Sequence, residues 1–270
     1  MDSALTIRVE QRDGRSFLKD AYVTQPFRIV PVGQYKRDNA AYLMIMSSSP
    51  GLLDNDFHDI QVNLAAHTSL QLQTQAYQRL YHMKNGAAQH TTVRMEEGSA
   101  FSYVPHPVVP QDEARFASVN RIYMQDNCRV IWSDIVTCGR KMSGEEFAYN
   151  RFQTRTEVFV HDRLVVKDNV LLAPQRMPVA GMGMFEGYTH QGSLLYYNAS
   201  GNSASDWLQV FYEKYAETEG ILFGISALQG DGFMVRVLGM GAEQLYRIFK
   251  EIEELLWEQE CLNKKLQEQI

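Results

Sequence analysis

Short runs in which apolar and polar residues alternate dominate the first two-thirds of the chain. β-Branched and aromatic residues recur at every second position, and Gly, Asn, Asp or Pro ends each run, which is typical of β-strands. The pattern predicts strands over residues 5–9, 21–24, 27–32, 42–46, 60–64, 70–74, 91–95, 101–104, 120–124, 129–136, 156–160 and 164–170. We therefore expect a mainly β fold.

A weak internal repeat links several of these strands. Val62, Val93 and Ile122 occupy equivalent places in the first strand of three strand pairs, at spacings of 31 and 29 residues. The equivalent positions in the second strands are Leu70, Phe101 and Val130. A fourth copy can begin at Val158, with its second strand over residues 164–166. Stacked pairs of this kind form the core of a β-solenoid, and a plain antiparallel sandwich with hairpins of similar length explains the spacing equally well.

The last third of the chain mixes helices and strands. A Gly- and Met-rich stretch covers residues 180–188, and a strand is predicted over residues 194–198. Apolar residues at helical spacing then predict a helix capped by Ser205 or Asp206. Its apolar positions are Trp207, Val210, Phe211 and Tyr215.

A strand hairpin and a long helix complete the pattern. Strands predicted over residues 222–228 and 233–238 flank the turn signal Gly230-Asp231-Gly232. Apolar residues then recur at helical spacing without Pro or Gly, which predicts an amphipathic C-terminal helix. They are Leu245, Ile248, Phe249, Ile252, Leu255, Leu256 and Leu262. No linker divides the sequence, so we expect one domain over residues 1–270, strand-rich over 1–200 and mixed over 201–270, with two helices in its C-terminal third.

Composition and charge narrow the class of protein. The 270 residues are 45% hydrophobic and 21% charged, as in an ordinary globular protein. The net charge of −6 provides no basic surface for nucleic acid or an anionic membrane. The sequence has no apolar run of about 18 residues, so we expect no transmembrane helix. The N-terminus lacks the features of a secretory signal. Cys128, Cys138 and Cys261 form no CxxC pair, so we expect a reducing, cytoplasmic setting.

The sequence contains no recognisable catalytic or nucleotide-binding motif. It has no GxxxxGK[ST] phosphate loop, no GxSxG nucleophile elbow and no HExxH. Its seven His residues form no i,i+2 or i,i+4 pair of the kind that builds a zinc site. We therefore expect a protein that is not an enzyme. The alternative is a metal-dependent β-barrel enzyme of cupin type, which would need two or three His and a Glu on adjacent strands.

One loop gathers three carboxylates and an imidazole between two predicted strands. These residues are Asp54, Asp56, His58 and Asp59. Asp and Asn side chains build turns by bonding the local backbone, which accounts for the loop without any ligand. The same residue types can also hold a hard or borderline divalent cation weakly. Residue type alone favours the turn.

Two further places concentrate polar chemistry. Asp134 interrupts an apolar run and, by alternation, lies on the same face as three apolar neighbours. These neighbours are Val130, Trp132 and Val136. Because an unpaired buried charge is costly, Asp134 is either paired or faces a wet cavity. Farther along, Arg140 and Glu145, together with Arg151, form either an ion-pair cluster or part of a solvated loop.

Several ordered motifs resemble those of the urease accessory proteins called UreD, or UreH in some lineages. The opening signature is Ser48-Ser49-Pro50-Gly51-Leu52-Leu53, followed by Asp56 and by Asp59-Ile60. Further motifs are Ser69-Leu70, Thr74-Gln75, Ala87-Ala88-Gln89, Tyr103-Val104-Pro105-His106-Pro107-Val108-Val109-Pro110, Ala114-Arg115-Phe116, Gly139-Arg140, Glu145 and Asn150-Arg151-Phe152. The segment Met184-Phe185-Glu186-Gly187-Tyr188-Thr189-His190 resembles the UreH branch. The sequence departs from the family at Asp54-Asn55, where many members carry Gly-Gly.

The resemblance implies a non-catalytic scaffold with a β-helix-like fold plus helices. The implied partners are UreF, the GTPase UreG and the urease apoprotein, in an accessory complex that can include a dimer. Nickel would pass transiently through an internal channel to the urease metallocentre, and no cofactor would be held permanently. Such a channel needs weak oxygen or imidazole ligands, because a tight cage would retain the ion. The acidic positions to consider are Asp56, Asp59, Asp134 and Glu145, with His58 as a weaker candidate.

Overall fold

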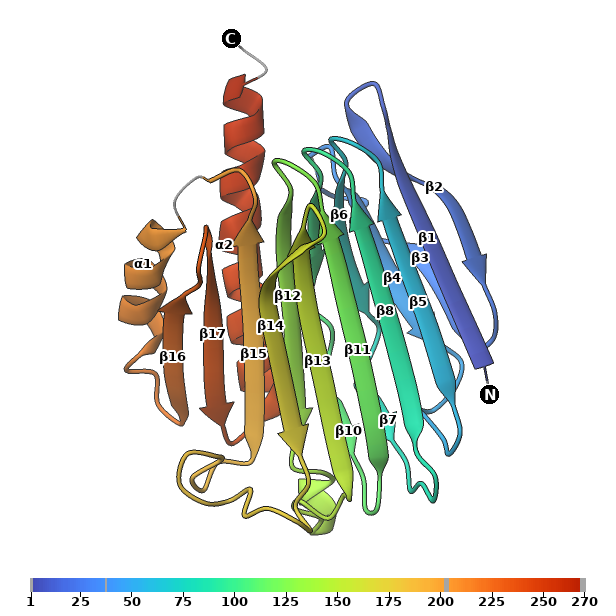
Figure 1. Ribbon diagram of the computed structural model, residues 1–270, viewed down its shortest axis with the longest axis vertical. Coiled ribbons are helices and arrows are strands. Elements are labelled where there is room, and N and C mark those ends of the chain that lie inside the picture. Colours follow the sequence, from blue (N-terminus) through green and yellow to red (C-terminus); the bar gives the residue numbers. More distant parts are fainter. Residues whose placement is uncertain (1, 37, 202–203, 268–270) are drawn as a thin grey trace.

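Two β-sheets stacked face to face make up most of the molecule (Figure 1). The computed structural model describes residues 2–36, 38–201 and 204–267. The seven-stranded sheet has the order β14 (Arg163–Leu172), β13 (Arg151–Val160), β11 (Arg115–Met124), β8 (Ala87–Met95), β5 (Phe57–Leu64), β1 (Asp2–Arg12) and β2 (Arg15–Val23). The ten-stranded sheet has the order β16 (Ile221–Ala227), β17 (Gly232–Gly239), β15 (His190–Asn198), β12 (Arg129–Thr137), β9 (Ala100–Tyr103), β6 (Ser69–Thr74), β4 (Ala41–Ser47) and β3 (Phe27–Pro31), with β7 (Gln78–Leu80) and β10 (Val108–Pro110) joined to it beside β12. Each strand predicted from the sequence overlaps an observed strand, and β7 and β10 were not predicted.

The internal repeat corresponds to the coils of a β-solenoid. Val62 pairs with Val93, Val93 with Ile122, and Ile122 with Val158, all in parallel strands of the seven-stranded sheet. The second strands of the repeat pair in parallel in the ten-stranded sheet, where Leu70 pairs with Phe101 and Phe101 with Val130. Each coil therefore gives one strand to each sheet. This parallel register favours the solenoid over the plain antiparallel sandwich.

The fourth copy of the repeat follows the solenoid only in its first strand. Val158 continues the parallel ladder, but residues 164–166 lie in β14, which runs back antiparallel beside β13 in the same sheet. His161 and Asp162 form the turn with φ angles of 48° and 61°. Two consecutive positive φ angles build the tight hairpin turn that suits right-twisted strands. The coil consequently ends there.

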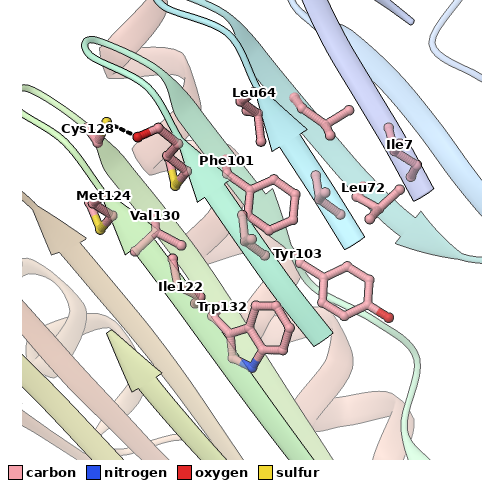
Figure 2. Close-up of a cluster of buried hydrophobic side chains, with 14 of the residues drawn as sticks. Ile7, Leu64, Leu72, Phe101, Tyr103, Ile122, Met124, Cys128, Val130 and Trp132 are labelled. Atoms are coloured by element: carbon pink, nitrogen blue, oxygen red, sulfur yellow. Dashed lines mark hydrogen bonds between the residues drawn. The ribbon is translucent and has the colours of Figure 1, made fainter. Parts of the chain in front are cut away.

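Apolar side chains fill the space between the sheets at the end of the molecule that carries the turn from β1 to β2. Ile7 and Ile122 of the seven-stranded sheet belong to one buried cluster with Phe101, Val130 and Trp132 of the other sheet (Figure 2). Alternation places every second residue of a strand on this inner face. The Cys128 thiol lies at one end of this cluster and bonds to backbone carbonyls. Tyr103 and Trp132 lie at the other end (Figure 2).

The two predicted helices cover the outer face of the ten-stranded sheet. Helix α1 (Ser205–Tyr215) packs on β16 and β17, and α2 (Ala242–Gln267) packs across β12, β15 and β17 (Figure 1). The predicted apolar stripe of α2 is buried at Leu245, Ile248, Phe249, Ile252 and Leu256. The side chains of Cys261 and Leu262 lie outside the described residues. Neither helix, over its described residues, has the length and apolar character needed to cross a membrane.

Candidate functional site

A band of polar side chains crosses the interior between the sheets. On the inner face of the seven-stranded sheet it consists of two adjacent rows, which we call the polar layer. One row comprises Ser3, His58, Gln89, Ser118 and Thr154, and the other comprises Thr91, Asn120, Thr156 and Asp168. Apolar clusters lie on both sides of this layer, one around Ile122 and one around Phe116 and Phe152. The polar layer thus divides the core in two.

The ten-stranded sheet faces this layer with its own polar row. Asp134 on β12 pairs with Ser193 on β15, which pairs with Arg236 on β17. The guanidinium of Arg236 forms an ion pair with Asp168 on β14, so it joins the two sheets at one edge of the layer. The prediction that Asp134 shares a face with Trp132 is confirmed, because Trp132 is part of the core between the sheets and donates to Asp134.

An internal cavity of about 40 Å³ lies between these rows. Its polar lining consists of Thr74, Gln78, Gln89, Tyr103, His106, Ser118, Asn120, Trp132 and Asp134. A volume of this size holds roughly two to four water molecules. Asp134 therefore faces a small polar cavity, which is one of the two alternatives that the sequence left open for this carboxylate.

Several buried oxygen atoms of the polar layer have no hydrogen-bond partner in the protein. They are Thr91 Oγ1, Asn120 Oδ1 and Ser3 Oγ. The Asn120 amide nitrogen donates to Thr156 Oγ1 at 3.1 Å, which leaves its oxygen turned the other way. Buried polar atoms are nearly always satisfied, by water or an ion where protein groups do not reach them. These oxygens are therefore suited to bind water or a passing cation.

Burial dominates the electrostatics of Asp134. Removal from bulk solvent, together with the nearby Asp168 carboxylate, raises the pKa of its carboxyl group to about 7. The indole of Trp132 donates to Asp134 Oδ2 at 3.0 Å and acts in the opposite direction, as does Arg236. Asp134 is consequently close to half protonated at neutral pH. A divalent cation in the cavity would favour the charged form.

The acidic loop divides into residues with different positions. Asp54 Oδ1 accepts hydrogen bonds from the backbone N–H groups of Asn85 and Gly86, both at 2.8 Å. It thereby ties its loop to the equivalent loop of the next coil, and these hydrogen bonds lower its pKa. Asp56 accepts from the N–H of Leu53, three residues earlier, at 2.8 Å and so closes the loop locally.

Asp59 and His58 point to opposite faces of β5. Asp59 lies on the outer face of the seven-stranded sheet, where Gln61 donates to it at 3.0 Å. His58 is buried on the inner face, with its ring edge-on to Phe27 at a centroid distance of 4.7 Å. Burial lowers the pKa of His58, so its imidazole is neutral at pH 7. His58 belongs to the polar layer, and Asp59 does not.

Glu145 serves a surface loop. Its carboxylate forms an ion pair with Arg140 and also accepts a hydrogen bond from the Asp112 N–H at 3.4 Å. The side-chain hydrogen bond from Arg140 lowers the pKa of Glu145. The predicted Arg140–Glu145 pair is thus confirmed, and Arg151 donates to Gln153. Of the five predicted site residues, only Asp134 lines the cavity, and His58 extends the polar layer beyond it.

Sequence reasoning missed most of the polar layer. Ser118 and Asn120 alternate with Phe116 and Ile122 on the same face of β11. The strand prediction began at Asn120, so Ser118 was left outside it. The available signal was that polar residues occupied alternate positions that also carry core residues and therefore face inward. Alternation alone could not show that the facing strand would carry Asp134 at the same level.

The described residues contain no group of three or more His, Cys, Asp or Glu side chains placed to share a metal ion. Their two sheets also remain open at β2, β3, β14 and β16, so they do not close into a barrel. Neither observation favours the cupin-type alternative. What the site offers instead is a row of weak oxygen ligands along a cavity.

The fold and the interior together define a β-solenoid protein with a polar layer and a small polar cavity between its sheets. The family model described as UreD urease accessory protein matches residues 1–269 of the chain. A urease accessory protein UreD from Flavobacterium johnsoniae is 46% identical over 257 residues, which cover 95% of this chain and 93% of the relative. Relatives of the same name from Haemophilus influenzae and Acetivibrio thermocellus are 34% and 30% identical, each over 95% of this chain and over 99% and 97% of the relative, respectively. The chain belongs to the UreD family of urease accessory proteins.

Proposed function

We propose that this chain is a non-catalytic scaffold that conducts nickel through the polar layer during urease maturation. It would act with UreF and UreG on the urease apoprotein, and the GTP chemistry would belong to UreG. Nickel is its cargo and is bound only in transit. The observation that carries the proposal is Asp134 facing a cavity whose other polar groups include an oxygen without a protein partner.

Ligand chemistry supports transit over storage. Carboxylate, hydroxyl and amide oxygens bind nickel more weakly than thiolate or imidazole clusters do. The buried Cys128 and Cys138 do not line the cavity. Asp134 supplies the negative charge that lowers the cost of moving a dication through a protein interior. Asn120 supplies a neutral oxygen at the cavity, and its strand neighbour Thr91 supplies another beside it in the polar layer.

The size of the cavity adds a physical condition. A volume of about 40 Å³ is too small for a nickel ion with its complete shell of six waters, since each water needs about 10–15 Å³ on the same measure. The ion would have to exchange part of its hydration shell for protein oxygens, or the cavity would have to widen. Dehydration of this kind is selective for ions whose lost waters the protein can replace.

The test compares an inward carboxylate with an outward one. Asp134→Ala is expected to lower the rate of urease activation about tenfold or more in a reconstituted mixture with UreF, UreG, urease apoprotein and nickel. Asp59→Ala is the matched control, because Asp59 lies on the outer face of the same fold. Both variants should co-purify with UreF as the unsubstituted chain does. Normal activation by Asp134→Ala would overturn the proposal.

A further inference from the structure

The ten-stranded sheet is interrupted at the level of the polar layer. Strand β9 follows β12 as far as the pair Tyr103–Trp132, and β10 resumes the ladder at the pair Val108–Val136. Residues 104–107 leave the sheet between these two points. The reason lies in the sequence, because Pro105 and Pro107 cannot donate to a ladder.

A second interruption lies directly beside the first. In the preceding coil, β6 ends at Thr74 and β7 begins at Gln78. Since β6 pairs with β9 and β7 pairs with β10, the two gaps adjoin. Thr74 and Gln78 line the cavity, as do Pro105 and His106. The wall of the cavity is therefore made of side chains here, without a backbone ladder.

His106 fills this gap. Its Nδ1 lies 3.1 Å from Thr74 Oγ1, and its backbone N–H donates to the same oxygen at 2.8 Å. On the outer side, the ring of Tyr246 from α2 stacks on the His106 ring at a centroid distance of 4.5 Å and an interplanar angle of 23°. The ring of Tyr77 flanks His106 at 6.0 Å, and its hydroxyl donates to Glu243 at 3.3 Å. A stack of half-buried rings thus separates the cavity from the outer face of the sheet.

The edge of the polar layer between β14 and β17 is closed in a different way. There, Arg236 forms its ion pair with Asp168 and places a fixed positive charge between β17 and β14. The guanidinium and the carboxylate neutralise each other, so this edge has no net charge that would attract a dication. Beyond His106, by contrast, the exposed carboxylate of Glu243 attracts cations. The ammonium group of Lys250 also lies near His106, so the difference between the two places is the kind of closure, side-chain rings at His106 and an ion pair at Arg236.

We propose that the gap at residues 104–107 is the portal of the internal cavity. His106, stacked on Tyr246, is the gate through which a divalent cation enters. Rotation of either ring about its side-chain bonds opens a path without breaking a strand pair. Side-chain rotations of this kind are fast compared with movements of sheets. Neutral imidazole can also bind a borderline cation briefly as it passes. The identity of the ion rests on the proposed function, and the portal itself does not.

The test measures access to the cavity without nickel. Asn120→Cys places a reporter thiol in the cavity, in a full-length chain whose Cys128, Cys138 and Cys261 are replaced by Ala. A small cationic methanethiosulfonate reagent labels this thiol at a rate set by access. His106→Ala and Tyr246→Ala are each expected to raise that rate about tenfold, which corresponds to an opening easier by about 1.4 kcal/mol. Tyr246→Phe keeps the ring and should label at the starting rate.

The control and the alternative outcomes are specific. His90→Ala removes a ring that packs against Phe57 on the outer face of the other sheet, so it should leave the rate unchanged. Equal labelling of His106→Ala and its parent would overturn the portal, and so would equal acceleration by His90→Ala. A second reporter, Ser118→Cys, repeats the measurement if Asn120→Cys does not fold. His106→Ala and Tyr246→Ala can accelerate labelling while Asp134→Ala activates urease normally. That result would support the portal and overturn the proposed nickel route.

Discussion

The raised pKa of Asp134 predicts how the stability of this protein depends on pH. The pKa of an unperturbed Asp is 3.8, and burial raises that of Asp134 to about 7 in the folded chain. Between these values the unfolded chain has released the proton and the folded chain still holds it. The free energy of unfolding therefore falls as pH rises through this window and levels off above pH 7.

The magnitude follows from the size of the shift. A difference of about three pH units corresponds to about 4 kcal/mol at most. Asn at this position stays neutral and can still accept the hydrogen bond of Trp132. Asp134→Asn should therefore equal the parent near pH 4 and exceed its stability by up to about 4 kcal/mol at pH 8.

Urea denaturation at pH 4, 5, 6, 7 and 8 provides the measurement, with the midpoint and slope fitted at each pH. Asp59→Asn is the control, since its side chain lies on the outer face beside Gln61 and the variant should follow the parent at every pH. A constant difference between Asp134→Asn and the parent across this range would refute the reasoning. It would mean that Asp134 is as well solvated in the folded chain as in the unfolded one.

Three further variants test the fold and the buried polar groups. Phe101→Ala should lower the free energy of unfolding by about 3–5 kcal/mol in urea denaturation, because the Phe101 ring is fully buried between the sheets. Glu253→Ala should lower it by about 1–3 kcal/mol in the same assay, since the buried carboxylate accepts from Ser102 and pairs with Lys250. Thr91→Val should leave the midpoint of thermal unfolding unchanged or raise it, because the Thr91 hydroxyl has no protein partner; a fall of several degrees would show that a bound water satisfies this hydroxyl.

The regular part of the fold could be predicted because its signal is periodic. Val62, Val93, Ile122 and Val158 were matched from spacing, and they pair with one another in the observed ladders. Periodicity reflects a physical requirement, since each coil must place an apolar residue at the same point of the core. The end of the solenoid was missed because it depends on the backbone conformation of the turn at His161.

The cavity could be predicted only in part. Asp134 was identified because a carboxylate within an apolar strand demands an explanation. Asn120 and Thr91 raise no such demand in a sequence, because polar residues are common in strands with one solvated face. The sequence places His106 between two prolines, and its contact with Tyr246 joins residues far apart in the chain. Such contacts depend on how α2 packs, which local patterns do not specify.

The polar layer lowers the stability of the fold, and this argues for its function. A buried polar group without a partner costs about 1–3 kcal/mol, against a total stability of about 5–15 kcal/mol for a typical domain. Valine at Thr91 would fit the same strand and extend the apolar cluster around Ile122. A coil built for stability alone would therefore carry apolar residues in these rows. Because successive coils place polar residues at the same level, the two rows together extend the polar layer from Ser3 on β1 to Asp168 on β14. The same repetition that builds the apolar core thus also builds the polar layer.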